Sequence, residues 1–82
     1  MTLTADISMY PNREEFIPPI DGFIARINQY EGLAVKTFPT STVVQGPYDL
    51  VMRAVHETMA ACHAEFGMAV YVCKFIPGYS AL

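Results

Sequence analysis

The segments Gly32-Leu33-Ala34-Val35 and Gly67-Met68-Ala69-Val70 decide the fold, because the second repeats the pattern of the first. Each segment places a glycine, which favours the left-handed backbone that closes a helix, directly before a short apolar run typical of a strand. The same event, a helix end followed by a strand, is therefore expected twice. The sequence predicts two strand-helix-strand units in succession.

Periodicity places the other elements around these two segments. Residues 3–10 alternate between apolar and polar side chains, which predicts a strand with two chemically different faces. Apolar residues recur at helical spacing from Ile17 to Tyr30, and Pro18-Pro19 suits a first helical turn, where a missing N–H costs nothing. Gly32 is the expected cap of this helix. The β-branched runs 33–38 and 40–46, separated by Pro39, predict two further strands.

A second helix is predicted to open at Gly46-Pro47 and to end at Gly67, with Asp49 near its positive N-terminal end. The last strand, residues 68–75, is apolar on both faces and is expected to be covered on both sides. With right-handed crossovers, this order gives an α+β ferredoxin-like sandwich: a four-stranded antiparallel sheet with two helices on one face. The length of the chain predicts that residues 1–82 form one domain.

Composition narrows the classes of function. An apolar fraction of 52% is high for a chain of 82 residues, so part of the apolar surface is expected to lie in an interface. No stretch approaches the roughly 20 apolar residues of a membrane span, and the N-terminus lacks the pattern of a signal peptide, so a cytoplasmic location is expected. A net charge of −3 with scattered basic residues argues against nucleic acid as a partner. Cys62 and Cys73 are interpreted as small buried thiols.

The fold leaves one face of the sheet without helices. This face is expected to carry one alternation set from each of the first and last strands: Thr4, Asp6, Ser8 and Tyr10 with Tyr71, Cys73 and Phe75. A mixture of aromatic and hydroxyl side chains suits a second sheet or a ligand better than bulk water.

Asp6 is the most informative candidate residue, because a carboxylate in an otherwise apolar or hydroxyl-bearing strand needs a partner. It is interpreted as an acceptor for an amino or cationic group, or as an edge residue that meets solvent or a subunit salt bridge. Ser8 and Thr40-Ser41-Thr42 add hydroxyls that can donate or accept hydrogen bonds. Four aromatic side chains are candidates for stacking on a flat ring, or for core and interface packing: Tyr10, Tyr48, Tyr71 and Phe75.

No set of residues predicts catalysis or a resident metal or cofactor. His56 and His63 lie on the second helix without a third ligand at matching spacing, and are interpreted as solvated helix residues. Cys62 and His63 are adjacent, so their side chains leave the helix in different directions and do not form an activated nucleophile. No glycine-rich phosphate loop is present. Binding is therefore predicted rather than enzymatic chemistry.

The order and spacing of several segments resemble the YkoF-type thiamine and hydroxymethylpyrimidine-binding proteins. The resemblance covers nearly the whole chain and lies in these segments: Ile7 to Pro11, Ile20 to Asn28, Tyr30 to Thr37, Ser41 to Gly46, Tyr48 to Met52 and Ala69 to Val72. It implies a ferredoxin-like domain that pairs sheet to sheet and binds thiamine or the pyrimidine alone without transforming it. Because this chain carries one copy, the paired unit would be a homodimer or homotetramer.

The resemblance implies a role in vitamin uptake, salvage or buffering. The ligand-binding residues expected from strand position and ligand chemistry are Asp6, Ser8, Tyr10, Ser41, Thr42, Tyr48 and Tyr71. Two alternatives stay open: a regulatory or scaffolding dimer that binds another metabolite or a protein, and an enzyme that uses a cleft at the sheet face.

Overall fold

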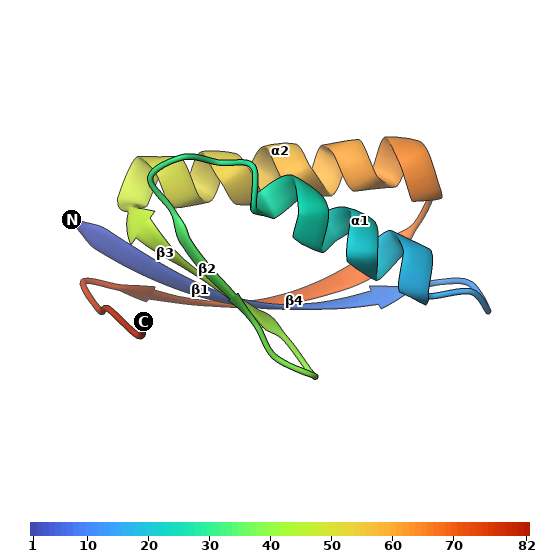
Figure 1. The fold of residues 1–82 in the computed structure, drawn as a ribbon, viewed down its shortest axis with the longest axis horizontal. Coiled ribbons are helices and arrows are strands. Elements are labelled where there is room, and N and C mark those ends of the chain that lie inside the picture. Colours follow the sequence, from blue (N-terminus) through green and yellow to red (C-terminus); the bar gives the residue numbers. More distant parts are fainter.

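A computed structural model describes all 82 residues and contains the predicted order of elements (Figure 1). The four strands are β1 (Thr2–Pro11), β2 (Ala34–Thr37), β3 (Thr42–Pro47) and β4 (Ala69–Pro77), and the two helices are α1 (Ile17–Ile27) and α2 (Tyr48–Phe66). The strands form one antiparallel sheet in the order β2-β3-β1-β4. Both helices cover the same face of this sheet, which confirms the ferredoxin-like α+β fold.

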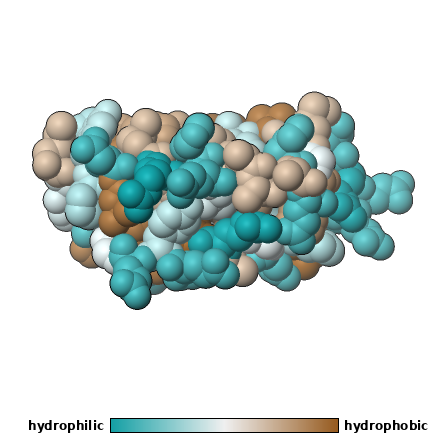
Figure 2. Space-filling model, turned by 90° about the horizontal axis from the view of Figure 1, so that it is seen from above, coloured by the Kyte–Doolittle hydropathy of each residue, from teal (hydrophilic) through white to brown (hydrophobic).

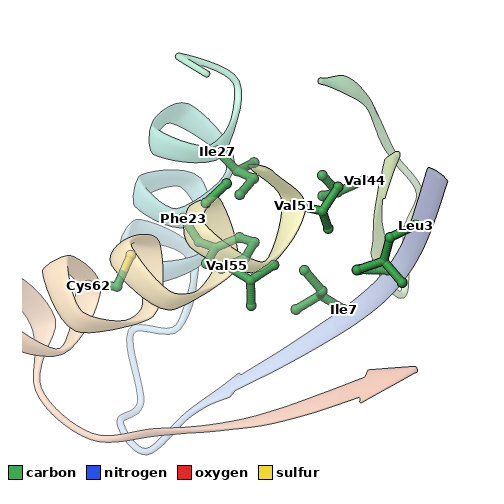
Figure 3. Close-up of a cluster of buried hydrophobic side chains, with 10 residues drawn as sticks. Leu3, Ile7, Phe23, Ile27, Val44, Val51, Val55 and Cys62 are labelled. Atoms are coloured by element: carbon green, nitrogen blue, oxygen red, sulfur yellow. The ribbon is translucent and has the colours of Figure 1, made fainter. Parts of the chain in front are cut away.

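The core lies between the sheet and the helices (Figure 3). The central strand β1 contributes Leu3, Ala5 and Ile7, each at most 2% exposed. The helices contribute Phe23 and Ile27 from α1, and Val51, Ala54, Val55 and Cys62 from α2, with Val44 from β3 completing the cluster. The alternation of β1 therefore directs its apolar set towards the helices.

The two glycines at the helix ends act differently from one another. Gly67 follows α2 directly with a φ of 85°, and its N–H donates to the carbonyl of His63, as predicted for a cap. The first helix ends at Ile27 rather than at Tyr30, and the Asn28 side chain donates to the carbonyl of Ile24. Gly32, with a φ of 89°, lies in the turn that leads into β2. The Asn28 N–H still donates to Ile24, but the next backbone bond, from the Gln29 N–H to the Arg26 carbonyl, spans three residues, so the helical pattern stops there.

The register of β4 overturns the expected composition of the face without helices. Lys74 pairs with Asp6 and Val72 with Ser8, so these residues share that face. The expectation that Tyr71, Cys73 and Phe75 lie there is wrong. Tyr71 and Cys73 pack against the core on the helix side, and Phe75 pairs with the buried Ala5. Both alternation sets of β4 are apolar, so hydrophobicity alone did not distinguish them.

The two sides of the sheet differ in cover. Figure 2 looks onto the helix layer, where hydrophilic residues surround smaller apolar patches. On the opposite side, β4 presents Val70 and Val72, which are 58% and 57% exposed. The expected cover on both sides of β4 is therefore absent from the single chain. Neither helix is long and apolar enough to cross a membrane.

Candidate functional site

A groove of about 570 Å³ opens between α1, the C-terminal end of β1 and the turn that joins β2 to β3. Its volume falls in the range of about 300–1,000 Å³ that is usual for small-ligand sites. Three elements line it: Ile7, Met9, Tyr10 and Pro11 from β1, Phe16, Ile20, Phe23 and Ile24 at and before α1, and residues 37–42 from the hairpin. The groove lies on the helix side of the sheet, not on its uncovered face.

The hairpin wall supplies four hydroxyl groups to an otherwise apolar groove: Thr37, Thr40, Ser41 and Thr42. None of these hydroxyls makes a hydrogen bond to another protein group. Each can donate one hydrogen bond and accept others, so the wall suits a ligand that presents both donors and acceptors.

The shape of this wall is fixed by two hydrogen bonds of the turn. The Phe38 N–H donates to the Ser41 carbonyl at 2.8 Å, which closes the turn between β2 and β3. The Ser8 Oγ, on the uncovered face of β1, donates to the Thr40 carbonyl at 3.0 Å. Ser8 therefore anchors the turn to the sheet and acts on the groove as a positioning residue.

The rim of the groove is aromatic and the lining carries no charged side chain. Tyr10, Phe16 and Phe38 are each at least 40% exposed, so their rings are available to a flat ligand. The Lys36 ammonium lies 5.4 Å from the centre of the Phe38 ring. The nearest cation–π contact at the rim is thus already made by the protein, and no lining carboxylate is present to balance a ligand cation.

The structure brings three of the seven predicted ligand-binding residues together: Tyr10, Ser41 and Thr42 line the groove. Thr42 pairs with Ile7, which places it on the helix side of the sheet. The other four lie elsewhere, and Tyr71 packs against the core beneath α1. Asp6 and Ser8 belong to the uncovered face, and Tyr48 begins α2 at the opposite end of β1, where its N–H donates to the Met1 carbonyl.

Asp6 has an incomplete set of partners. One carboxylate oxygen, Oδ2, lies 3.6 Å from the Lys74 ammonium. The other oxygen, Oδ1, is buried without a hydrogen-bond partner. Leaving a buried acceptor unpaired costs about 1–3 kcal/mol, or more for a charged group, so this oxygen destabilises the single chain.

A second depression, of about 340 Å³, lies between the two helices and is polar. Its charged groups already have partners within the chain. The Arg26 Nη2 donates to Glu65 at 2.8 Å, and the Tyr30 hydroxyl donates to Glu57 at 2.6 Å. The first bond joins α1 to α2 and the second joins the segment after α1 to α2, so the depression is accounted for by the packing of the helices.

Tyr71 lies beneath α1, with its ring centre 5.8 Å from that of Phe23. Burial, followed by the neighbouring Cys62 thiol, raises the pKa of Tyr71 to about 12. Burial also raises the pKa of the Cys62 and Cys73 thiols. All three groups are therefore neutral at pH 7; Cys62 is a buried thiol as predicted, whereas Cys73 is only partly buried.

This shift predicts a loss of stability in alkali. The folded chain keeps the Tyr71 proton at pH values where the unfolded chain loses it, so the associated stability is present below about pH 10 and is lost as the pH rises towards 12. We expect the free energy of unfolding, measured in urea from pH 9 to 12, to fall by about 1–2 kcal/mol less for Tyr71→Phe than for the wild type, after allowance for the partial exposure of the ring. If the free energies of unfolding of the two proteins fell in parallel with pH, the loss of stability in alkali would not come from Tyr71.

Sequence reasoning missed most of the groove. Phe16, Ile20, Ile24 and Phe38 were not candidates, because they come from a helix and from turns rather than from the sheet face. One signal was present: Thr37-Phe38-Pro39-Thr40 places an aromatic residue in a turn, where burial in the core is unusual.

No protein-family model and no curated protein matches the chain, but solved structures share its fold. A protein of Streptococcus pneumoniae aligns with a TM-score of 0.88 and 23% identity over 96% of this chain and 89% of that chain. A Thermotoga maritima protein, provisionally assigned to thiamine biosynthesis or salvage, has a TM-score of 0.84 and 23% identity over 99% and 86% of the two chains. A domain of unknown function from Bacillus cereus has a TM-score of 0.75 and 16% identity over 93% and 75%. At these identities the likeness establishes the fold.

Proposed function

We propose that this protein binds an aminopyrimidine, either free hydroxymethylpyrimidine or the pyrimidine half of thiamine, in the groove between α1 and the β2-β3 turn. The observation that carries the proposal is the wall of four unpaired hydroxyls opposite an apolar helix face. An aminopyrimidine offers an amino donor and ring-nitrogen acceptors on a flat apolar ring, which matches such a wall. The fold shared with a protein provisionally assigned to thiamine biosynthesis or salvage supports the same ligand class.

The charge of the groove favours the neutral pyrimidine over thiamine. Thiamine carries a cationic thiazolium ring, and the lining has no carboxylate to balance it. The Lys36 ammonium at the Phe38 rim adds a like charge nearby. The proposed role is therefore binding of the pyrimidine in uptake, salvage or buffering inside the cell, without chemical conversion.

Calorimetric titration tests this proposal. Hydroxymethylpyrimidine is expected to bind with a dissociation constant in the micromolar range, as suits a ligand of about 10 non-hydrogen atoms, and thiamine about tenfold more weakly. The double variant Ser41→Ala/Thr42→Val removes two hydroxyls with little change of shape and is expected to weaken binding by about 10- to 100-fold.

Two controls make the titration specific. Ser80→Ala removes a hydroxyl that makes no hydrogen bond and lies outside the groove, so this variant should bind like the wild type. A pyrimidine analogue without the amino group should bind more weakly than hydroxymethylpyrimidine. No heat with either ligand at high protein concentration would refute the proposed function.

The second part of the proposal is a homodimer or homotetramer paired through the uncovered sheet face. The open sheet face, defined as Asp6, Val70, Val72 and Lys74, combines exposed apolar side chains with one acid and one base. On a twofold axis the acid of each copy can meet the base of the other. The same surface favours the scaffolding dimer as the second candidate function.

A further inference from the structure

The last residues of the chain fold back over the sheet on the side opposite the helices (Figure 1). We name residues Gly78–Leu82 the C-terminal strap. Its first hydrogen bond runs from the Gly78 N–H to the carbonyl of Thr2, at 2.6 Å. Thr4 holds the next part twice: its hydroxyl donates to the Tyr79 carbonyl and accepts from the Ala81 N–H at 3.3 Å.

Gln45 holds the end of the strap. Its side-chain oxygen accepts from the Leu82 N–H at 2.7 Å, and its side-chain nitrogen lies 3.5 Å from the Leu82 carbonyl. Thr4 and Gln45 are paired residues of neighbouring strands, so the strap crosses from β4 over β1 to β3. The strap covers Thr4, which is only 1% exposed although it lies on the face without helices.

The strap is held almost entirely by its backbone. All five of its residues are exposed, and none belongs to the core cluster. The bonds to Gln45 are exposed and those to Thr4 are partly buried. A segment with few buried contacts and a handful of hydrogen bonds opens at a small cost compared with global unfolding. The strap can therefore leave the sheet while the rest of the fold stays intact.

The strap and a second sheet compete for the same space. Two sheets that pack face to face lie about 10 Å apart, with their side chains interdigitated between them. A chain segment that lies on the sheet fills this gap. A second copy can reach the open sheet face while the strap is closed, but it cannot cover the half of the face that contains Thr4 and Gln45.

We propose that the C-terminal strap regulates the sheet-to-sheet pairing of this protein: it is closed on Thr4 and Gln45 in the single chain, and its release allows a second copy to cover that half of the face. This inference rests on the pairing proposed above. It is independent of the ligand, because the strap and the groove lie on opposite sides of the sheet and share no residue.

Ala81→Pro tests the strap without changing the sheet face, because it removes the N–H that donates to Thr4. The matched control is Ser80→Ala, since neither the N–H nor the hydroxyl of Ser80 makes a hydrogen bond. A second variant, Gln45→Thr, keeps a polar strand residue but is too short to hold Leu82. Hydrogen exchange of the Leu82 amide reports strap opening, and sedimentation equilibrium reports self-association.

The expected result is that Ala81→Pro and Gln45→Thr both lose protection at Leu82 and lower the dissociation constant of the dimer at least tenfold, while Ser80→Ala matches the wild type. An opened strap with an unchanged or raised dissociation constant would overturn the regulatory role. If the protection of the Leu82 amide were unchanged in both variants, the hydrogen bonds to Thr4 and Gln45 would not be what holds the strap closed. Absence of self-association in every protein would overturn both strap regulation and pairing, whereas the calorimetric proposal would stand.

Discussion

Replacing Ile24 with tryptophan is expected to weaken the binding of hydroxymethylpyrimidine by at least about 100-fold. Ile24 lies on the wall that α1 contributes to the groove, half-buried and facing the hydroxyl-bearing turn. An indole attached there is a flat apolar ring of the same kind as the ligand, and its tether gives it a high effective concentration in the groove. Calorimetric titration under the conditions used for the wild type measures the loss.

The neighbouring residue provides the control. Ala25 is exposed on α1 and does not line the groove, so Ala25→Trp adds the same side chain to the same helix outside the site. This variant should bind within about twofold of the wild type. If Ile24→Trp bound normally, the ligand would not lie in the groove. If both variants lost binding while they kept the wild-type thermal stability, the indole would act through the helix rather than by filling the groove.

The order of elements could be predicted because each one carries a local signal. Period-two alternation in β1, helical spacing in α1 and the glycine that closes α2 are all properties of neighbouring residues. The end of α1 carries no such signal: the helical hydrogen bonds stop after Asn28, although the apolar pattern continues to Tyr30.

The face of β4 could not be predicted from hydrophobicity, because each of its alternation sets is mostly apolar. Charge contained the missing information. Lys74 belongs to the set of Val70 and Val72, and its pairing with Asp6 places that set on the uncovered face. A search for complementary charges between β1 and β4 would have favoured the observed register.

The groove depends on a contact between distant elements, which no local pattern reports. The hydroxyls of Ser41 and Thr42 were identified from the sequence as ligand-binding candidates, but no sequence pattern assigned them to a face of the sheet. In β3 it is Val43 that pairs with Asp6, while Thr42 pairs with Ile7. A shift of one residue in this pairing would move the Thr42 hydroxyl from the helix side to the uncovered face.

The second large effect is expected at Leu3, which is fully buried on the central strand beside Val44 and Val51 (Figure 3). Leu3→Ala should lower the free energy of unfolding by about 2–5 kcal/mol, because it removes apolar contacts and leaves a cavity. A chain of this length has a total stability of only about 4–12 kcal/mol, so the variant should lose a large part of it. Urea unfolding, together with the melting temperature, measures the change.

Met52→Ala is the matched comparison, because Met52 is an apolar residue of similar size that is 40% exposed on α2. Its truncation should change the free energy of unfolding by less than about 0.5 kcal/mol, since little buried area is lost and alanine favours the helix. Leu3 pairs with Gly46 and Pro77, far along β1 from the groove. The folded fraction of Leu3→Ala should therefore bind hydroxymethylpyrimidine with the wild-type affinity. A cost below about 1 kcal/mol at Leu3 would instead mean that the helices do not pack on this end of β1 as tightly as its burial implies.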